Sequence, residues 1–364
     1  MKTMLRNNLL LLTGDHLLAA YYAGTASGIE FADGALQLAR GAAEGMLETA
    51  ALSLPAFTRL VASWNASTPA GCCVELAVQV RVDGTWSRWF SWGKWADAGA
   101  NGGSVAHQED ELALLDVDVL QVRQGAADAV RFRLRLERCG ASTPNVGDAS
   151  AGSPAATPRV RLMACTFQRV TPASRPYVHE EIALSVPARA QLPVPVIGRE
   201  ICSPTSLAMV MQYYGCNEPT EQVAAGVKDA AAGIYGNWAY NVAYAGERGF
   251  TAWVERCDSL EDVKEYLKEG IPVIASVRTP KDKPLPGAVL PYPAGHLLVV
   301  TGFTEEGGQR FVLVNDPAAY SEADVPRRYP LARFLEAWRN IVYVVRPISA
   351  APAAEDPRPT APGA

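Results

Sequence analysis

The stretch Glu200-Ile201-Cys202-Ser203-Pro204-Thr205-Ser206 leads into a predicted helix and places a cysteine just before it. Residues 206–214 lack turn formers and are followed by Gly215, which predicts a helix with a C′ glycine. Pro204 suits a first helical turn, because its missing N–H would have no acceptor there. A thiol at this position lies near the positive end of the helix dipole, which favours the thiolate. Cys202 is therefore a candidate nucleophile; the alternative is a small buried apolar residue, as most free cysteines are.

Two polar residues later in the chain are candidate partners for Cys202. His296 starts the strand-like run Gly295-His296-Leu297-Leu298-Val299-Val300, and Asp316 ends the next one in Val314-Asn315-Asp316-Pro317. Adjacent antiparallel strands would bring Asp316 to one imidazole nitrogen while the other nitrogen faces the thiol. This is the nucleophile, base and orienter arrangement of covalent catalysis. The alternative is a hydrogen-bonded core histidine and an aspartate that caps a turn before Pro317.

The residues around these candidates predict an α+β domain. Ser259-Leu260-Glu261-Asp262 has the form of a capping box and predicts a second helix. Strand-like runs follow at 272–277, 296–303, 311–314 and 341–345. Helices that come first and strands that come afterwards are typical of this class.

The first half of the chain predicts an antiparallel β-sandwich. Apolar residues alternate with others over 74–82 and with arginines over 131–136, so each strand has one buried and one solvated face. Asp83-Gly84 predicts a hairpin turn after the first of these strands. The predicted organisation is an N-terminal segment 1–28, a sandwich 29–170 with a mobile loop at 140–158, a linker 171–183, a second domain 184–347 and a disordered Ala- and Pro-rich tail 348–364.

Composition excludes several classes of protein. A chain of 364 residues, 49% hydrophobic and 20% charged, is long enough for two domains that each bury a core. A net charge of -5 argues against nucleic-acid or anionic-membrane partners, and no apolar run reaches the ~20 residues of a membrane span. Seven dispersed cysteines, without a C-x-x-C pair, predict neither a disulfide framework nor a zinc site. The short apolar stretch at the N-terminus falls short of a signal peptide, so we expect a cytoplasmic protein, with secretion as the alternative.

The motifs of the second half resemble a known family. Leu184-Ser185-Val186-Pro187, Gln191, the Cys202 motif, Gly236-Asn237-Trp238, Gly295-His296 and Asn315-Asp316-Pro317 are similar, in this order, to the stand-alone, papain-like branch of family thirty-nine of the cysteine peptidases, the bacteriocin-processing type. The resemblance covers residues 184–346. It implies a papain-like fold with Cys202 as nucleophile, His296 as general base and acid, and Asp316 as orienter.

Gln191 matches the position of the family's oxyanion glutamine. Its amide would donate to the developing oxyanion together with the Cys202 backbone N–H. Papain-like enzymes usually keep this glutamine closer to the cysteine, whereas the two are eleven positions apart here. The alternative is a surface glutamine that follows a strand.

The first half resembles the strand-rich domain that precedes this catalytic module in some bacterial relatives. The likeness rests on residues 63–66 and 85–95, which together hold five tryptophans. Exposed indoles would form a platform for carbohydrate. The alternative is that Trp64, Trp86 and Trp92 fill the sandwich core.

These observations favour a thiol hydrolase that cleaves peptide bonds in a peptide or protein substrate, without a metal or organic cofactor. The sequence has no G-x-x-x-x-G-K-[ST] motif, so the transporter-fused form of the family is not expected. One alternative is an amidase or acyltransferase that uses the same site. Another is an inactive peptidase-like protein whose sandwich domain binds a glycan or a protein.

Residues 279–294 form a proline-rich stretch without periodicity, which is typical of a lid or binding loop. We expect this loop to overhang the cleft beside His296 and to help select substrate. The alternative is an ordered surface loop stiffened by prolines. Cys216 and Cys257 are expected to be unpaired and inert.

Overall fold

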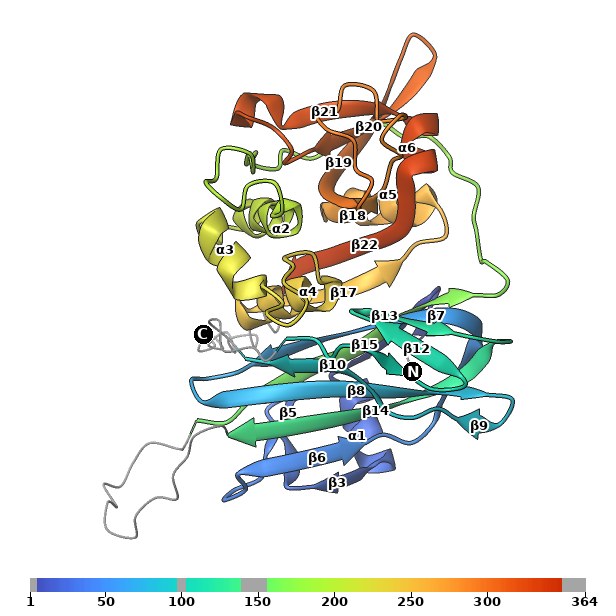
Figure 1. The fold of residues 1–364 in the computed structure, drawn as a ribbon, viewed down its shortest axis with the longest axis vertical. Helices are drawn as coiled ribbons and strands as arrows, with labels where there is room; N and C mark the ends of the chain where they lie inside the picture. Colours follow the sequence, from blue (N-terminus) through green and yellow to red (C-terminus); the bar gives the residue numbers. More distant parts are fainter. Residues whose placement is uncertain (1–4, 97–102, 139–155, 349–364) are drawn as a thin grey trace, which may run out of the picture.

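The computed structural model describes residues 5–96, 103–138 and 156–348, which form two domains that pack against each other (Figure 1). The predictions of a mobile loop at 140–158 and of a disordered tail at 348–364 concern residues that lie almost entirely outside these ranges. Within the described ranges, no helix is both long and apolar enough to span a membrane.

The first domain is built on an antiparallel β-sheet, as the alternating patterns predict. β8 and β14 pair along their whole length, and the predicted Asp83-Gly84 turn connects β8 to β9 with positive φ at both residues. The elements are β1 (Leu5–Arg6), β2 (Leu9–Thr13), α1 (Asp15–Ala23), β3 (Thr25–Ser27), β4 (Ile29–Ala32), β5 (Ala35–Leu38), β6 (Glu44–Glu48), β7 (Leu52–Ser67), β8 (Cys72–Val82), β9 (Thr85–Trp86), β10 (Phe90–Trp95), β11 (Gln108–Glu109), β12 (Ala113–Asp116), β13 (Val119–Val122), β14 (Ala127–Arg138) and β15 (Arg159–Arg169).

The N-terminal residues belong to this sheet, and the expectation of a separate segment 1–28 is wrong for its described part. β2 pairs with β15 over five residues, and α1 packs on β2. Leu10 and Leu12 on β2 are almost fully buried, so the strand contributes to the core rather than preceding the domain. The pairing joins residues about 150 positions apart and has no local signal in the sequence.

The second domain has the α+β architecture that the helix and strand patterns predict. Its sheet runs in the order β17-β22-β18-β19-β20-β21, with β16 beside β19. The helix predicted at 206–214 begins four residues earlier, at Cys202, and the capping box of Ser259 and Asp262 is present. The elements are β16 (Ile182–Ala183), α2 (Cys202–Tyr213), α3 (Thr220–Val227), α4 (Trp238–Glu247), β17 (Phe250–Arg256), α5 (Leu260–Lys268), β18 (Val273–Val277), β19 (His296–Glu306), β20 (Gln309–Asn315), the 3-10 helix η1 (Glu322–Asp324), β21 (Pro326–Pro330), α6 (Leu331–Ala337) and β22 (Trp338–Pro347).

The tryptophans of the first domain divide into two groups. Trp64, Trp92 and Trp95 are fully buried in the core. Trp86 is only half-buried, so the expectation that it fills the core is wrong: its ring lies with Trp89 under the guanidinium group of Arg131, at 4.7 and 5.3 Å. Because arginine covers these indoles, the carbohydrate platform has no support.

Side chains of the first domain cover the open edge of the second sheet. β17 is the terminal strand of that sheet, and its outward backbone groups recur at every second residue. The side-chain amide of Asn65 makes two hydrogen bonds with the backbone of Ala252: it donates to the carbonyl (2.8 Å) and accepts from the N–H (2.9 Å). Ser63 accepts from the Val254 N–H (3.4 Å), and Thr166 accepts from the Arg256 N–H (2.7 Å). The first domain therefore satisfies polar groups that would otherwise form an exposed strand edge.

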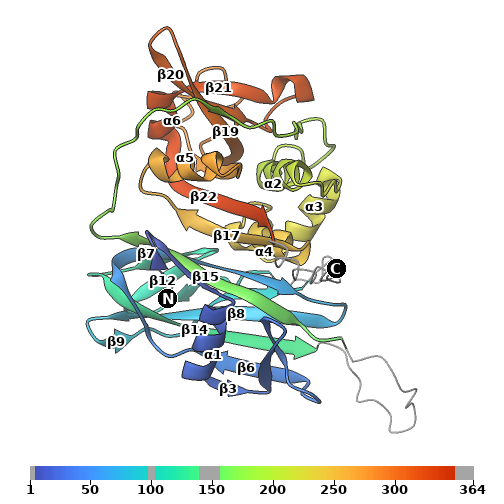
Figure 2. The same cartoon turned by 180° about the vertical axis from the view of Figure 1, so that it is seen from behind.

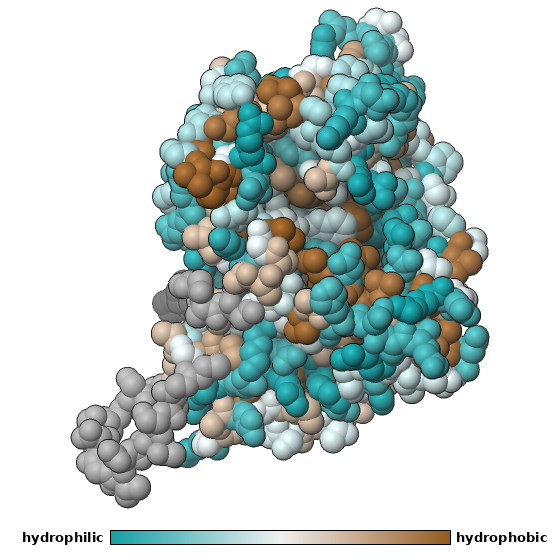
Figure 3. Space-filling view, in the orientation of Figure 1, coloured by the Kyte–Doolittle hydropathy of each residue, from teal (hydrophilic) through white to brown (hydrophobic). Residues whose placement is uncertain are grey.

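Helix α4 makes the second part of this interface, lying over β7 in both views (Figures 1 and 2). Asp118 of the first domain accepts from the Trp238 N–H at the start of α4 (2.6 Å). Tyr240 packs its ring against Trp95 at 5.4 Å. Gly246 lies so close to Asn65 that an added Cβ would stand 2.8 Å from the asparagine Cβ, which requires glycine here. Figure 3 shows hydrophobic residues gathered along the boundary between the domains on this face.

We predict that Asn65→Ala lowers the free energy of unfolding by about 2 kcal/mol or more, because a buried unpaired backbone N–H or C=O costs about 1–3 kcal/mol. Urea denaturation measures the change. Gln309→Ala, which removes an exposed amide, serves as the control and should change stability by no more than about 0.5 kcal/mol. Equal, small effects of both substitutions would contradict the edge-covering role of Asn65.

Candidate active site

Two polar contacts fix the start of helix α2, where Cys202 lies partly exposed. Ser203 contacts the hydroxyl of Tyr343 on β22 through its own hydroxyl (3.0 Å), and Ser206 donates to the Leu297 carbonyl on β19 (3.1 Å). As the first residue of the helix, Cys202 has a backbone N–H with no acceptor inside the helix. The thiol therefore lies at a rigid helix start, beside the strand that carries His296.

The structure brings Cys202, His296 and Asp316 together. Antiparallel pairing of β19 and β20, in which Asn315 lies opposite Val299, places Asp316 near the start of β19. His296 Nε2 lies 2.7 Å from Asp316 Oδ1, and the imidazole also hydrogen-bonds the Cys202 side chain. Since Asp316 occupies Nε2, the nitrogen that remains for the sulfur is Nδ1.

The electrostatics of the three groups favour an ionised thiol. Burial alone would raise the pKa of Cys202, but the charge and hydrogen bond of His296 and the N–H of Leu297 lower it below its usual 9.0. Burial alone would lower the pKa of His296, but the charges of Asp316 and Cys202 raise it to about 10. Despite its burial, Asp316 has a pKa well below the usual range, because the charge of His296 and the hydrogen bonds from His296 and two tyrosines stabilise the carboxylate.

Two tyrosines that the sequence analysis missed complete the surroundings of Asp316. The carboxylate is fully buried and accepts from His296, from the Ala318 N–H (3.0 Å), and through Oδ2 from Tyr292 (2.7 Å) and Tyr329 (2.6 Å). Burial and the negative charge of Asp316 raise the pKa of both tyrosines, so they remain proton donors. The ring of Tyr292 also stacks on the His296 imidazole at 3.9 Å and 10°. Nothing in the local pattern marks these residues, because their contacts depend on the tertiary fold.

Gln191 lies between the two segments that carry the cysteine and the aspartate. Its Nε2 donates to the Gly198 carbonyl (2.7 Å), and its backbone N–H donates to the Pro317 carbonyl (2.8 Å). A series of turns over 191–200 folds the chain back on itself, which accommodates the spacing of eleven positions between Gln191 and Cys202. Gln191 is buried, so the alternative of a surface glutamine is excluded.

The proline-rich loop 279–294 is fixed at its base beside His296. Thr279 and Tyr292 bond each other through the Thr279 N–H (3.1 Å) and the Thr279 hydroxyl (2.8 Å). Leu285 is buried in the core of the second domain, whereas the residues on either side of it are exposed. The loop thus brings Tyr292 to the site; its influence on substrate choice stays a prediction.

The remaining thiols of the second domain differ from Cys202 in their electrostatics. Cys216 and Cys257 are free, and burial raises the pKa of each. Such thiols stay protonated and unreactive near neutral pH. In the part of the chain that the structure describes, no group of three His, Cys, Asp or Glu side chains could hold a metal ion.

Both domains match known family models. Residues 183–345 match the Peptidase_C39 like family, and residues 18–153 match the Peptidase C39 N-terminal domain. No curated protein matches the chain.

Several solved structures resemble the second half of the chain. A double glycine motif protease from an AMS/PCAT transporter, solved with a leader peptide, is 22% identical (TM-score 0.33; 47% of this chain and 100% of that one). The peptidase domain of Streptococcus ComA is 19% identical (TM-score 0.32; 47% and 100%). A putative C39-like peptidase from Bacillus anthracis is 21% identical (TM-score 0.36; 46% and 98%). These likenesses are too distant to add to the family matches.

We predict that Tyr292→Leu slows alkylation of Cys202 at neutral pH more than Tyr292→Phe does. Phenylalanine keeps the ring stacked on His296 and loses only the bond to Asp316, which corresponds to about a tenfold change in rate. Leucine loses both contacts, so the imidazolium that stabilises the thiolate is no longer held in place. The rate of iodoacetamide labelling at Cys202 measures the effect. Tyr320→Phe at an exposed tyrosine should leave the rate unchanged, and equal rates in all three variants would contradict the prediction.

Proposed function

Because the chain joins a peptidase C39 N-terminal domain to a Peptidase_C39-like domain and is a cysteine peptidase of this family, we propose that Cys202, His296 and Asp316 form its catalytic triad. The observation that carries the proposal is the continuous hydrogen-bonded chain from the thiol through the imidazole to a buried carboxylate. This arrangement supplies an activated nucleophile, a proton carrier and a group that fixes the ring orientation. The substrate class is a peptide or a protein.

The proposed reaction begins with the Cys202 thiolate and the His296 imidazolium. The sulfur attacks the carbonyl carbon of the scissile peptide bond, and a C–S bond forms while the carbonyl oxygen takes up the negative charge. His296 then gives its Nδ1 proton to the leaving amine as the C–N bond breaks. In the second half, His296 removes a proton from water as the water oxygen attacks the thioester carbonyl carbon. The C–S bond then breaks, which releases the carboxylic acid and returns the Cys202 thiolate. Asp316 stays ionised throughout and keeps the ring in position.

We assign the oxyanion donors to the Cys202 backbone N–H and to Gln191. The side-chain NH2 group of Gln191 donates one of its two hydrogens to the Gly198 carbonyl, which fixes the orientation of the amide. The other hydrogen of this NH2 group is left for the substrate. Cys202 contributes the N–H that the helix itself does not use. Two preorganised donors in a water-poor site stabilise the charge that develops on the carbonyl oxygen.

We predict non-additive losses of activity when the triad is substituted, because each loss disables the same step. Cys202→Ala should abolish peptide hydrolysis, and His296→Ala should cost nearly as much, because the thiol loses its proton acceptor and the amine its proton donor. Asp316→Asn should cost less, and Gln191→Ala should lower kcat by ~10²–10³-fold, as for other single oxyanion donors. Steady-state kinetics on a cleaved peptide measure the series.

Cys216→Ala is the matched control, because Cys216 is a partly exposed thiol on the same domain. It should leave both hydrolysis and labelling of Cys202 unchanged. Peptide hydrolysis by the Cys202→Ala variant would contradict the proposed thiol-peptidase mechanism. A wild-type protein whose Cys202 does not react with a thiol probe would instead indicate an inactive peptidase-like protein.

We predict a bell-shaped pH dependence of kcat/KM. Activity should rise with pH as Cys202 ionises below the usual thiol pKa of 9.0, and fall as His296 loses its proton at about pH 10. Asp316→Asn removes the charge that raises the pKa of His296, so the alkaline limb should move to lower pH in this variant. An alkaline limb that does not move would contradict the assignment of that limb to His296.

A further inference from the structure

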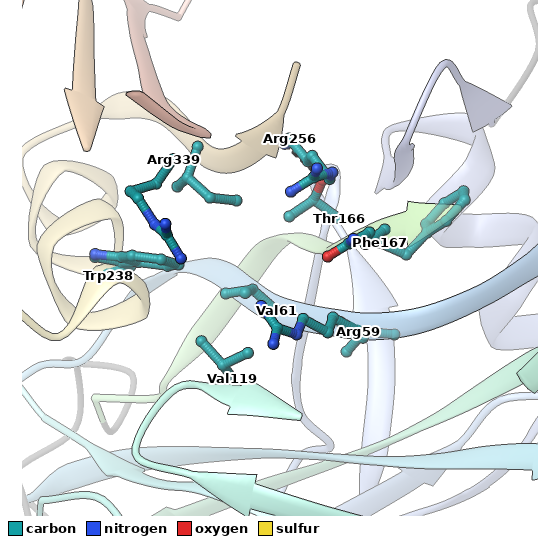
Figure 4. A pocket seen from close by; sticks show the side chains of 11 residues that line it. Arg59, Val61, Val119, Thr166, Phe167, Trp238, Arg256 and Arg339 are labelled. Carbon is teal, nitrogen blue, oxygen red and sulfur yellow. Dashed lines mark hydrogen bonds between the residues drawn. The ribbon is translucent and has the colours of Figure 1, made fainter. Parts of the chain in front are cut away.

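A pocket of about 90 Å³ lies where the two domains meet, away from the candidate catalytic residues (Figure 4). Its wall from the first domain includes Arg59 on β7 and Thr166 on β15. Its wall from the second domain includes Trp238 at the start of α4, Arg256 at the end of β17 and Arg339 on β22. None of Cys202, His296, Asp316 and Gln191 is among the residues that line it.

The pocket concentrates positive charge. Arg59 and Arg339 make no ion pair within the described residues, and no acidic residue is among those that line the pocket. Arg256 has one carboxylate neighbour, Asp258, whose Oδ1 lies 3.5 Å from the buried Nε, and this Nε makes no shorter hydrogen bond. Burial lowers the pKa of Arg256; the charge of Asp258 opposes this effect, and the nearby charge of Arg59 adds to it. Arg59 and Arg256 therefore repel each other across the pocket, and an anion between them would offset this repulsion.

The shape of the pocket suits a compact anion. Figure 4 shows Arg59 reaching in from β7 while Arg256 and Arg339 enter from the opposite side. Guanidinium groups from different directions present forked donors that match the oxygens of a tetrahedral oxyanion. Apolar neighbours such as Val61 and Val119 limit the space to a small group, so a folded partner or a nucleic acid is not accommodated.

We propose that this interdomain pocket binds a phosphate group, held between Arg59 of the first domain and Arg256 and Arg339 of the second. The site is independent of the peptidase mechanism, since it shares no residue with it. A phosphate bound here bridges the two domains and stabilises their packing by mass action, because only the folded arrangement brings the three arginines together.

The test is calorimetric titration of the full chain with inorganic phosphate at constant ionic strength, with acetate as the comparison anion. Wild type should bind phosphate saturably at one site and bind acetate more weakly. Arg59→Gln and Arg339→Gln should each weaken phosphate binding about tenfold or more, since each removes charged hydrogen bonds. Arg40→Gln, at an exposed arginine between β5 and β6, is the control and should change nothing.

Two further measurements keep the outcomes distinct. Thermal unfolding with phosphate should raise Tm in wild type and in Cys202→Ala alike, so failure of the catalytic proposal leaves this one standing. Titration with O-phosphoserine separates the sources: tighter binding than inorganic phosphate indicates a phosphate ester as the ligand, and weaker binding indicates the free ion. The proposal is overturned if wild type shows no saturable phosphate binding, or if Arg40→Gln weakens binding as much as Arg339→Gln.

Discussion

The outer edge of β17 is the constraint on which the rest of the molecule depends. A terminal strand leaves a row of backbone donors and acceptors, and at Ala252, Val254 and Arg256 the first domain supplies their partners. The next strand inward, β22, carries Tyr343, whose hydroxyl contacts that of Ser203, the residue after Cys202. The same side chains that join the domains therefore also fix the strands on which helix α2 rests. The first domain is part of the framework of the catalytic domain.

Buried charge organises the site in a similar way. Asp316 is removed from water completely, and an isolated carboxylate there would be very costly. Four donors satisfy it, and they come from β19, from the loop before β19, from β21 and from the turn that follows β20. Because one carboxylate binds all four segments, the position of the imidazole is set by the packing of the whole sheet rather than by a single contact.

The sequence predicts those parts of the structure whose causes are local. The Asp83-Gly84 turn, the capping box at Ser259 and the strand that begins at His296 each follow from the residues at that point, and each is present. The pairing of β2 with β15 and the contact of Tyr292 with Asp316 join residues far apart in the chain. The hydrophobic periodicity of the sequence therefore does not predict them. Trp86 lies outside the core, where Arg81 of β8 and Arg131 of β14 cover its ring, and alternation alone does not reveal this. Cys202, His296 and Asp316 are recognisable from their order and their places at the ends of elements.

The loop that carries Tyr292 has a fixed base and an exposed outer part, residues 281–284 and 286–287. Its base is tied to the imidazole by stacking and to Thr279 by two hydrogen bonds, and Leu285 anchors its middle in the core. The exposed residues at 281–284 and 286–287 lie outside the core and make surface contacts only: Lys283 pairs with Glu336, and the carbonyls of Pro284 and Gly287 accept from Arg333 and Arg327. Substitutions at these exposed residues are therefore expected to leave the position of His296 unchanged. The predicted role of this loop in substrate selection would then allow binding preferences to change at this one place, while His296 keeps its position.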